Sequence, residues 1–267
     1  MLIDFHTHCF PDKICERAMD KLRFASGNII TCTDGSLSGL KNSMKENGVD
    51  VSVVLNIATN PRQQTNVNDF AASINNEKDI FSFGSVHPDS PDVYEELERI
   101  KELGLKGVKF HPDYQDFESD DPKMKPIYKK VSELGLIAVF HSGFDYGYPP
   151  PYKNMPKAMA KAASWFDSPV IAAHWGGINC NEEVLKYLCG SMDNLYLDLS
   201  FGYCSMPKAY ASMILEKQGT DKVVFATDTP WHSVEMEMRL LSSLELSRED
   251  MDKILYKNAC SLLKINA

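Results

Sequence analysis

Short apolar runs alternate with longer stretches of helical periodicity about eight times along this chain. The runs are rich in Val, Ile, Leu and Phe and lack strict polar alternation. That pattern is typical of parallel strands that are buried on both faces. We predict strands at residues 2–8, 51–58, 80–87, 107–111, 136–141, 170–174, 195–200 and 223–227.

The segments between these runs contain residues that typically begin or end helices. Prolines that follow a capping residue open several of them, and Gly104 and Gly135 stand where helices would end. A Gly/Ser/Thr-rich stretch at 26–36 reads as an inserted loop. We predict helices at 11–23, 38–47, 61–75, 91–103, 122–134, 155–166, 181–189, 206–217 and 234–244. A capping box at Ser247 opens a last helix, which we expect to pack on the outside of the fold.

Eight strand-then-helix units in 267 residues fit a single domain, residues 1–267. We therefore predict an α/β fold, a (β/α)8 TIM barrel with a C-terminal helix. A doubly wound open sheet is the main rival. It would carry a Gly-rich phosphate loop after its first strand, and His8-Cys9-Phe10-Pro11 occupies that position instead.

The charge and composition of the chain argue against nucleic acid and membranes as partners and leave a small-molecule substrate. The net charge of -9 and the absence of any basic run argue against nucleic acid. The apolar runs are too short to cross a membrane, and because the first predicted strand begins at Leu2 we expect no signal peptide. Seven scattered cysteines without a CxxC pair suggest free thiols in the cytoplasm. Cys9 is either a soft metal ligand or a small buried apolar residue.

Histidines gather at the predicted strand ends and are absent from the predicted helices. They are His6, His8, His87, His111, His141 and His174, with His232 just after the eighth strand. In a barrel of this kind the carboxyl ends of the strands form the site. Imidazoles together with Asp228 suit zinc or a similar divalent ion, which lowers the pKa of bound water to about 7. Asp228 could instead cap a helix, and for His87 and His111, each before a proline, we favour a structural role.

Aromatic residues also follow the strands. Tyr146 lies in a Tyr- and Pro-rich loop after the fifth strand, and Trp175 and Trp231 follow the sixth and eighth. These rings either line a substrate pocket or only cover the barrel. Arg62, after the second strand, is a candidate anion contact on position alone.

Seven segments together resemble the amidohydrolase superfamily. They are IDFHTH at 3–8, GVKFHP at 107–112, FHSG at 140–143, AAHWGG at 172–177, LYLDLS at 195–200, FATDTPW at 225–231 and LYKNA at 255–259. Within it the chain is most similar to the branch that contains aminocarboxymuconate-semialdehyde decarboxylase. The resemblance implies that His6, His8, His141 and Asp228 bind a divalent metal. It makes His174 either a water-activating base or a ligand of a second metal.

The role of Lys109 decides whether the expected site would hold one metal ion or two. In two-metal members of the superfamily, a carboxylated lysine on the fourth strand bridges the metals, and GVKFHP resembles that stretch. The alternative is a structural cation paired with an acid. The resemblance to the decarboxylase branch favours one ion, most simply zinc, with His174 as the base.

The resemblance implies three possible functions. The first is hydrolysis of an amide, ester or lactone-type bond by metal-activated water, with Asp228 and His174 moving protons. The second is a carboxy-lyase, and the third is a barrel that keeps its metal without catalysis. A decarboxylase must hold a carboxylate, and Arg62 is the only arginine near a strand end, so we expect a hydrolase. A homodimer in which the neighbouring chain supplies an arginine stays open.

Overall fold

Eight parallel strands follow one another in a ring in the computed structural model, which describes residues 1–203 and 205–266. The strands are β1 Ile3–Thr7, β2 Val51–Leu55, β3 Ile80–Phe83, β4 Gly107–Phe110, β5 Ile137–Phe140, β6 Val170–Ala172, β7 Leu195–Asp198 and β8 Val223–Val224. They pair in chain order as β1-β2-β3 and as β4 to β8. Bridges between Gly84 and Val108, and between Thr7 and Thr229, join the two groups. The expected (β/α)8 barrel is therefore confirmed.

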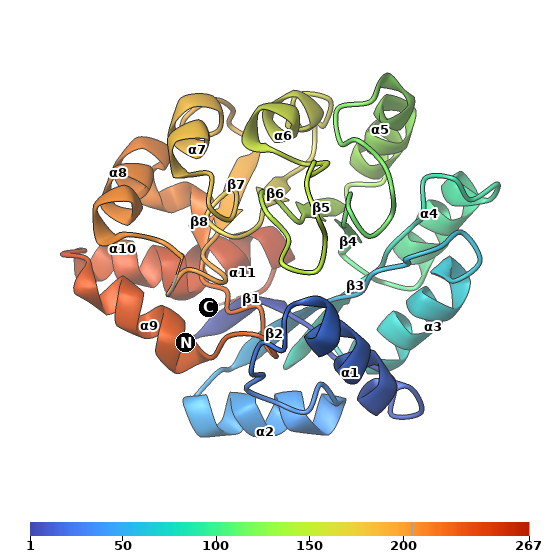
Figure 1. Cartoon of the computed structure of the whole chain (residues 1–267), viewed down its shortest axis with the longest axis horizontal. Helices are drawn as coiled ribbons and strands as arrows, with labels where there is room; N and C mark the ends of the chain where they lie inside the picture. Colours follow the sequence, from blue (N-terminus) through green and yellow to red (C-terminus); the bar gives the residue numbers. More distant parts are fainter. Residues whose placement is uncertain (204, 267) are drawn as a thin grey trace.

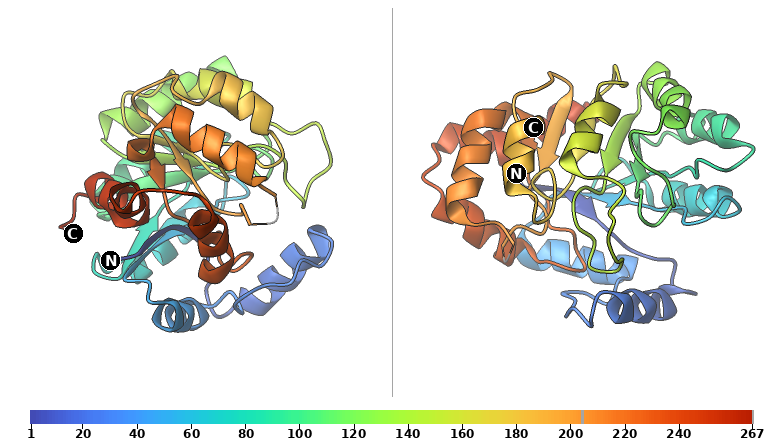
Figure 2. Two further views of the ribbon diagram at one scale, coloured as in Figure 1. Left: turned by 90° about the vertical axis from the view of Figure 1, so that its left-hand side faces the viewer. Right: turned by 45° about the horizontal axis from the view of Figure 1, so that its top comes forward.

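Helices surround the strands (Figure 1). They are α1 Cys15–Ala25, α2 Leu37–Asn47, α3 Gln64–Ile74, α4 Val93–Glu102, α5 Lys125–Glu133, α6 Pro156–Ala163, α7 Asn181–Tyr187, α8 Lys208–Gln218 and α9 Val234–Ser243, followed by α10 Arg248–Asp252 and α11 Asn258–Leu263. Short 3-10 helices, η1 Pro122–Met124 and η2 Thr220–Lys222, precede α5 and β8, and a π-helix, η3 Lys253–Lys257, joins α10 to α11. The views in Figure 2 show α1 at the edge of the molecule.

The predicted elements are all present, most of them with shorter bounds, although α2 begins one residue before its predicted start. Most strands end two to four residues before the apolar run does, because the chain turns toward the helices there. Ser247 is the N-cap of the last helical segment, as the expected capping box requires, since its Oγ accepts a hydrogen bond from the Asp250 amide at 3.1 Å. Helix α3 begins at Gln64, three residues after the predicted start at Pro61.

The C-terminal helix does not pack on the outside. Ala259, Cys260, Leu262 and Leu263 of α11 join the apolar cluster that fills the barrel interior, with strand residues such as Ile3. Lys106, just before β4, donates to the carbonyl of Leu263 at 2.8 Å, which places α11 at the amino ends of the strands. The apolar face of α11 therefore closes the end of the barrel opposite the histidines.

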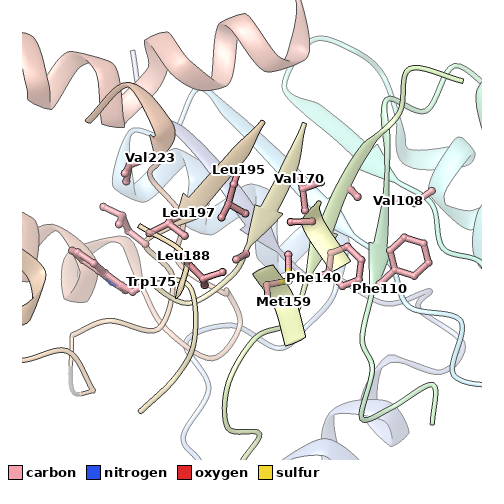
Figure 3. Packing of buried hydrophobic residues seen from close by; sticks show 14 of the residues in the cluster. Val108, Phe110, Phe140, Met159, Val170, Trp175, Leu188, Leu195, Leu197 and Val223 are labelled. Atoms are coloured by element: carbon pink, nitrogen blue, oxygen red, sulfur yellow. The ribbon is translucent and has the colours of Figure 1, made fainter. Parts of the chain in front are cut away.

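Two buried clusters form the core. One fills the barrel interior, and the other lies between the strands and the helices (Figure 3). Alternation along the strands divides them: Ile137 and Val139 of β5 point inward, and Ala138 and Phe140 point outward. On β4 the corresponding inward position is held by Lys109, which is 1% exposed. A buried amine in the barrel interior indicates a functional position.

In the described part of the chain no helix combines the length and the apolar character that crossing a membrane would take. The six cysteines within that part are free, as expected, and Cys204 lies outside the described residues.

Replacing Leu97 with Ala tests the helix-facing core. Leu97 is fully buried on α4, so truncation leaves a cavity and should lower the free energy of unfolding by about 2–4 kcal/mol. Tyr94→Ala on the same helix, where Tyr94 is 42% exposed, is the matched control and should change it by less than about 0.5 kcal/mol. Urea denaturation measures both, and equal effects would contradict this assignment of the core.

Candidate metal centre

Three predicted ligands meet at the carboxyl end of β1. His6 Nε2 lies 3.1 Å from His8 Nε2, and Asp228 Oδ1 lies 3.4 Å and 3.2 Å from the same two nitrogens. His6 and His8 are two residues apart, and the strand directs both imidazoles to one point, as their spacing predicts. Asp228 arrives from the loop after β8, whose backbone is tied to β1 by a bond from the Asp228 amide to the His6 carbonyl at 2.8 Å.

The hydrogen bonds made by the Nδ1 atoms of His6 and His8 determine which atoms of the two rings are left to bind a cation. His8 Nδ1 lies 2.7 Å from the Leu55 carbonyl, and His6 Nδ1 lies 2.9 Å from Asp198 Oδ2. Both partners are acceptors, so each neutral imidazole carries its proton on Nδ1 and turns a lone pair outward at Nε2. Two lone pairs and a carboxylate oxygen therefore converge on one point. A divalent cation fits this donor set, and nitrogen and oxygen ligands of this kind suit zinc.

Beside these three residues, His141 and His174 turn lone pairs toward each other. His174 Nε2 lies 3.0 Å from His141 Nδ1. His141 Nε2 lies 3.2 Å from the Phe144 carbonyl, so its proton belongs there. His174 Nδ1 contacts Ser200 Oγ at 2.8 Å, and that hydroxyl donates to Asp198 at 2.5 Å. Each ring thus turns an acceptor toward the other, which also fits a shared cation.

Asp198 connects the two groups, and sequence reasoning assigned it no role. Its Oδ2 accepts from His6, and its Oδ1 accepts from the backbone amide of His174 at 2.9 Å. It is fully buried at the end of β7. The available signal was its place in LYLDLS, a strand-end carboxylate, which only the ring closure brings beside His6.

Burial keeps the imidazoles neutral. It is the largest cause that lowers the pKa of His6 and of His174 well below the ordinary histidine value, with neighbouring Lys109 and His141 adding to it. The pKa of His141 falls to about 3 for the same reason, with His111 as the next contribution. Neutral imidazole is the form that binds metal, so these rings are ready to act as ligands at neutral pH.

Lys109 points into the same cluster from β4. Its Nζ lies 3.3 Å from His6 Nε2. Burial lowers its pKa to about 8, against the opposing effect of Asp198, Asp228 and Asp145. An amine with a lowered pKa is neutral more often, and a neutral amine is the form that can react with carbon dioxide.

Two of the site residues stand in backbone conformations that L-residues rarely adopt. His174 has φ 60° and Asp228 has φ 69°. A strained backbone conformation persists only where many surrounding contacts hold it, and such residues are frequent at functional sites. Here it turns each side chain back toward the barrel axis directly after its strand.

The cluster lies at the bottom of a cavity of about 800 Å³. Tyr146 and Trp231, two of the predicted substrate contacts, line it. Trp175 does not line it: its side chain is 2% exposed and packs in the outer core, as labelled in Figure 3. Arg62 does not line it either, although its neighbour Gln63 does. The structural role favoured for His87 agrees with its place, because His87 Nδ1 accepts from the Asp89 amide at 3.2 Å, outside the cavity.

His111, for which a structural role was also favoured, lines the cavity instead. Its ring stacks on His141 with centroids 4.2 Å apart, and its Nε2 lies 3.2 Å from Asp145 Oδ2. Tyr114 stacks on its other face at 3.8 Å. Sequence reasoning missed Asp145 and Tyr114, since neither ends a strand, and each reaches the site through a loop.

The fold and the site define a (β/α)8 barrel with a candidate metal centre at the carboxyl ends of its strands, and comparisons with known proteins agree. The amidohydrolase family model matches residues 3–265, so the chain belongs to the amidohydrolase family. No curated protein sequence matches the chain.

Solved structures of several proteins share the fold. An uncharacterised TIM-barrel protein from Bordetella bronchiseptica superposes with a TM-score of 0.76 at 19% identity, covering 98% of each chain. 5-Carboxyvanillate decarboxylase from Sphingomonas paucimobilis gives 0.73 at 16% identity, covering 99% of each chain. A protein from Pseudomonas putida that is provisionally named a 2-pyrone-4,6-dicarboxylic acid hydrolase gives 0.71 at 14% identity, covering 100% of this chain and 98% of that one. At these identities the likeness establishes the fold alone.

Replacing Asp198 with Asn tests the bridge between the two groups. Because the carboxylate orients His6 and holds its proton on Nδ1, the substitution should weaken metal binding about 10–100-fold. Competition with a chromophoric chelator measures this affinity. Asp193→Asn, at an exposed position just before the same strand, is the control. An unchanged affinity in Asp198→Asn would show that the bridge does not support the ligands.

Proposed function

We propose that this protein is a metal-dependent hydrolase that cleaves an amide, ester or lactone-type bond of a small organic substrate. The observation that carries the proposal is the make-up of the cavity. Converging lone pairs form its floor, and none of its lining residues in the described part of the chain is an arginine. A hydrolase needs a metal and a group that moves protons, and both needs can be met by the residues present.

His6, His8 and Asp228 would hold the first ion. When bound, it would activate a water and polarise the substrate carbonyl. Asp228 reaches the same point as the two imidazoles, so its free carboxylate oxygen can take the proton of the attacking water and pass it to the leaving group. Tyr146 and Trp231 line the cavity and would contact the substrate.

The alternative is a carboxy-lyase, the activity named for the Sphingomonas structure. Its substrate carboxylate would need a fixed cation. Lys109 and Lys21 are the only Lys or Arg side chains among the described lining residues. Lys109 is packed against His6, and Lys21 is exposed. Neither has the bidentate geometry with which an arginine grips a carboxylate, so we rank this alternative second.

The geometry also favours a second ion, in contrast to the single ion that the branch resemblance suggested. An ammonium 3.3 Å from His6 Nε2 would compete with a cation for the same lone pair. Carboxylation of Lys109 would remove that charge and would supply oxygen ligands in the neighbourhood of His141 and His174, whose pKa values the Lys109 ammonium also lowers. In a two-ion site His174 is a ligand, and Asp228 alone carries the proton.

Metal content tests this assignment. We expect elemental analysis of zinc-reconstituted wild type to give two ions per chain, and a ¹³C carbamate signal to appear after exchange with labelled bicarbonate. Lys109→Met should lose the signal and at least one ion, and His6→Ala should lose metal as well. His87→Ala, which alters a histidine outside the cavity, is the control. One ion per wild-type chain, unchanged in Lys109→Met, would favour the single-ion site, and equal metal in wild type and His6→Ala would contradict both.

The reaction class is tested with two substrate panels. We expect metal-dependent turnover among lactones, esters and amides, and a loss of at least about 10²-fold in kcat in Asp228→Asn, because the asparagine cannot accept the proton. A parallel panel of aromatic and muconate-type carboxylates is assayed for carbon dioxide release. Carbon dioxide release that depends on metal and on Asp228, without hydrolysis of any panel member, would overturn the proposal in favour of the carboxy-lyase.

A further inference from the structure

Helix α1 presents an apolar stripe to the cavity. Ile14, Ala18 and Leu22 follow each other at intervals of four residues, so they lie on one face, and all three line the cavity. The residues that α1 buries, Cys15 and Met19, are on a different face. Cys15 Sγ donates to the Asp34 carbonyl, so this face is held by the loop that precedes α2. The apolar stripe is thus available to whatever occupies the cavity.

Helix α3 contributes apolar residues to the same cavity. Val67 and Phe70 line the cavity, and Ile57, after β2, lies between the two helices in sequence and also lines it. In the view of Figure 1, α1 lies between α2 and α3. Leu22, Ile57 and Val67 are only partly buried and belong to neither core cluster in the described part of the chain. Apolar side chains that pack against no core gain stability only from a ligand or a partner.

Charge is nearly absent from this wall. Among the described lining residues at 10–29 and 55–70, Lys21 is the only charged one, and it is exposed. The ionisable groups of the cavity gather at the other end, around His6, Asp228 and Asp145. The cavity therefore has a polar floor where bonds are cleaved and an apolar extension that leads away from it between α1 and α3.

We propose that the substrate carries an extended apolar arm, of the acyl-chain type, that lies between α1 and α3 while its carbonyl sits at the metal centre. The substrate class is then an ester, amide or lactone with a medium-length hydrocarbon arm. This inference rests on the proposed hydrolase for the reacting end, and it adds what the other end of the substrate is. The apolar wall and the metal cluster line one cavity of about 800 Å³. Because they share this space, we favour a part of the substrate over a separate partner as the occupant of the wall.

A homologous series of straight-chain hydroxamic acids, from acetyl to octanoyl, tests the arm. The head group is constant along the series, so the change in affinity with chain length reports the wall alone. Calorimetry on zinc-loaded wild type should show the dissociation constant falling about fourfold for each added methylene. Leu22→Asp on α1 and Val67→Asp on α3 should each flatten the series, because a carboxylate in the wall disfavours the buried chain.

Phe24→Asp is the matched control. Phe24 lies on the same helix as Leu22, is 81% exposed and does not line the cavity, so the slope of the series should be unchanged. Circular dichroism and melting temperature confirm that each variant is folded. A flat series in wild type overturns the inference, and so does an equal loss of slope in Phe24→Asp and Leu22→Asp. If Leu22→Asp changed the oligomeric state and the wild-type series were flat, the wall would instead bind a second copy of this chain, which also overturns it.

This binding test separates the two proposals. A steep series together with no turnover of the corresponding alkyl esters and amides would leave the apolar arm in place and reject the hydrolase. Turnover of short esters that does not improve with chain length, together with a flat hydroxamate series, would keep the hydrolase and reject the arm.

Discussion

Acceptor atoms face one another at the carboxyl end of the barrel, and this crowding governs the site. His6, His8 and Asp228 turn lone pairs to one point, and His141 and His174 do the same next to it. Buried acceptors at such distances repel one another unless a proton or a cation lies between them. Burial lowers the pKa values of the imidazoles, which disfavours the proton and favours a metal ion.

The barrel supplies the rigidity that holds this arrangement together. Parallel strands end at one rim, and the ring brings the β8 end back beside β1 with β7 next to β8, so Asp198 and Asp228 reach His6 from the far end of the chain. The opposite rim is closed by α11, which leaves the histidine end as the open one. The positive φ angles of His174 and Asp228 are sustained by this frame.

The cavity above the metal centre combines two chemistries in one space. Its floor contains the ionisable groups, and its outer wall is formed by helices α1 and α3 with little charge. Helix α1 is supplied by the segment between β1 and β2, which also contains α2 and is longer than one helix needs. The insertion therefore adds a wall to the cavity without altering the strands that position the ligands. A barrel of this family can vary its substrate in this way while its reacting groups stay fixed.

The sequence by itself determined the strand order, the barrel and the residues at the strand ends, because buried parallel strands leave a local apolar pattern and the histidines end those runs. It also determined that His6 and His8 act together, since a strand fixes their direction. Only the tertiary structure paired His141 with His174, placed Asp198 between the two groups, and buried Trp175 in the core. It also turned α11 under the barrel. Those outcomes depend on ring closure and loop paths, which join residues far apart in the chain and leave no local periodicity to read.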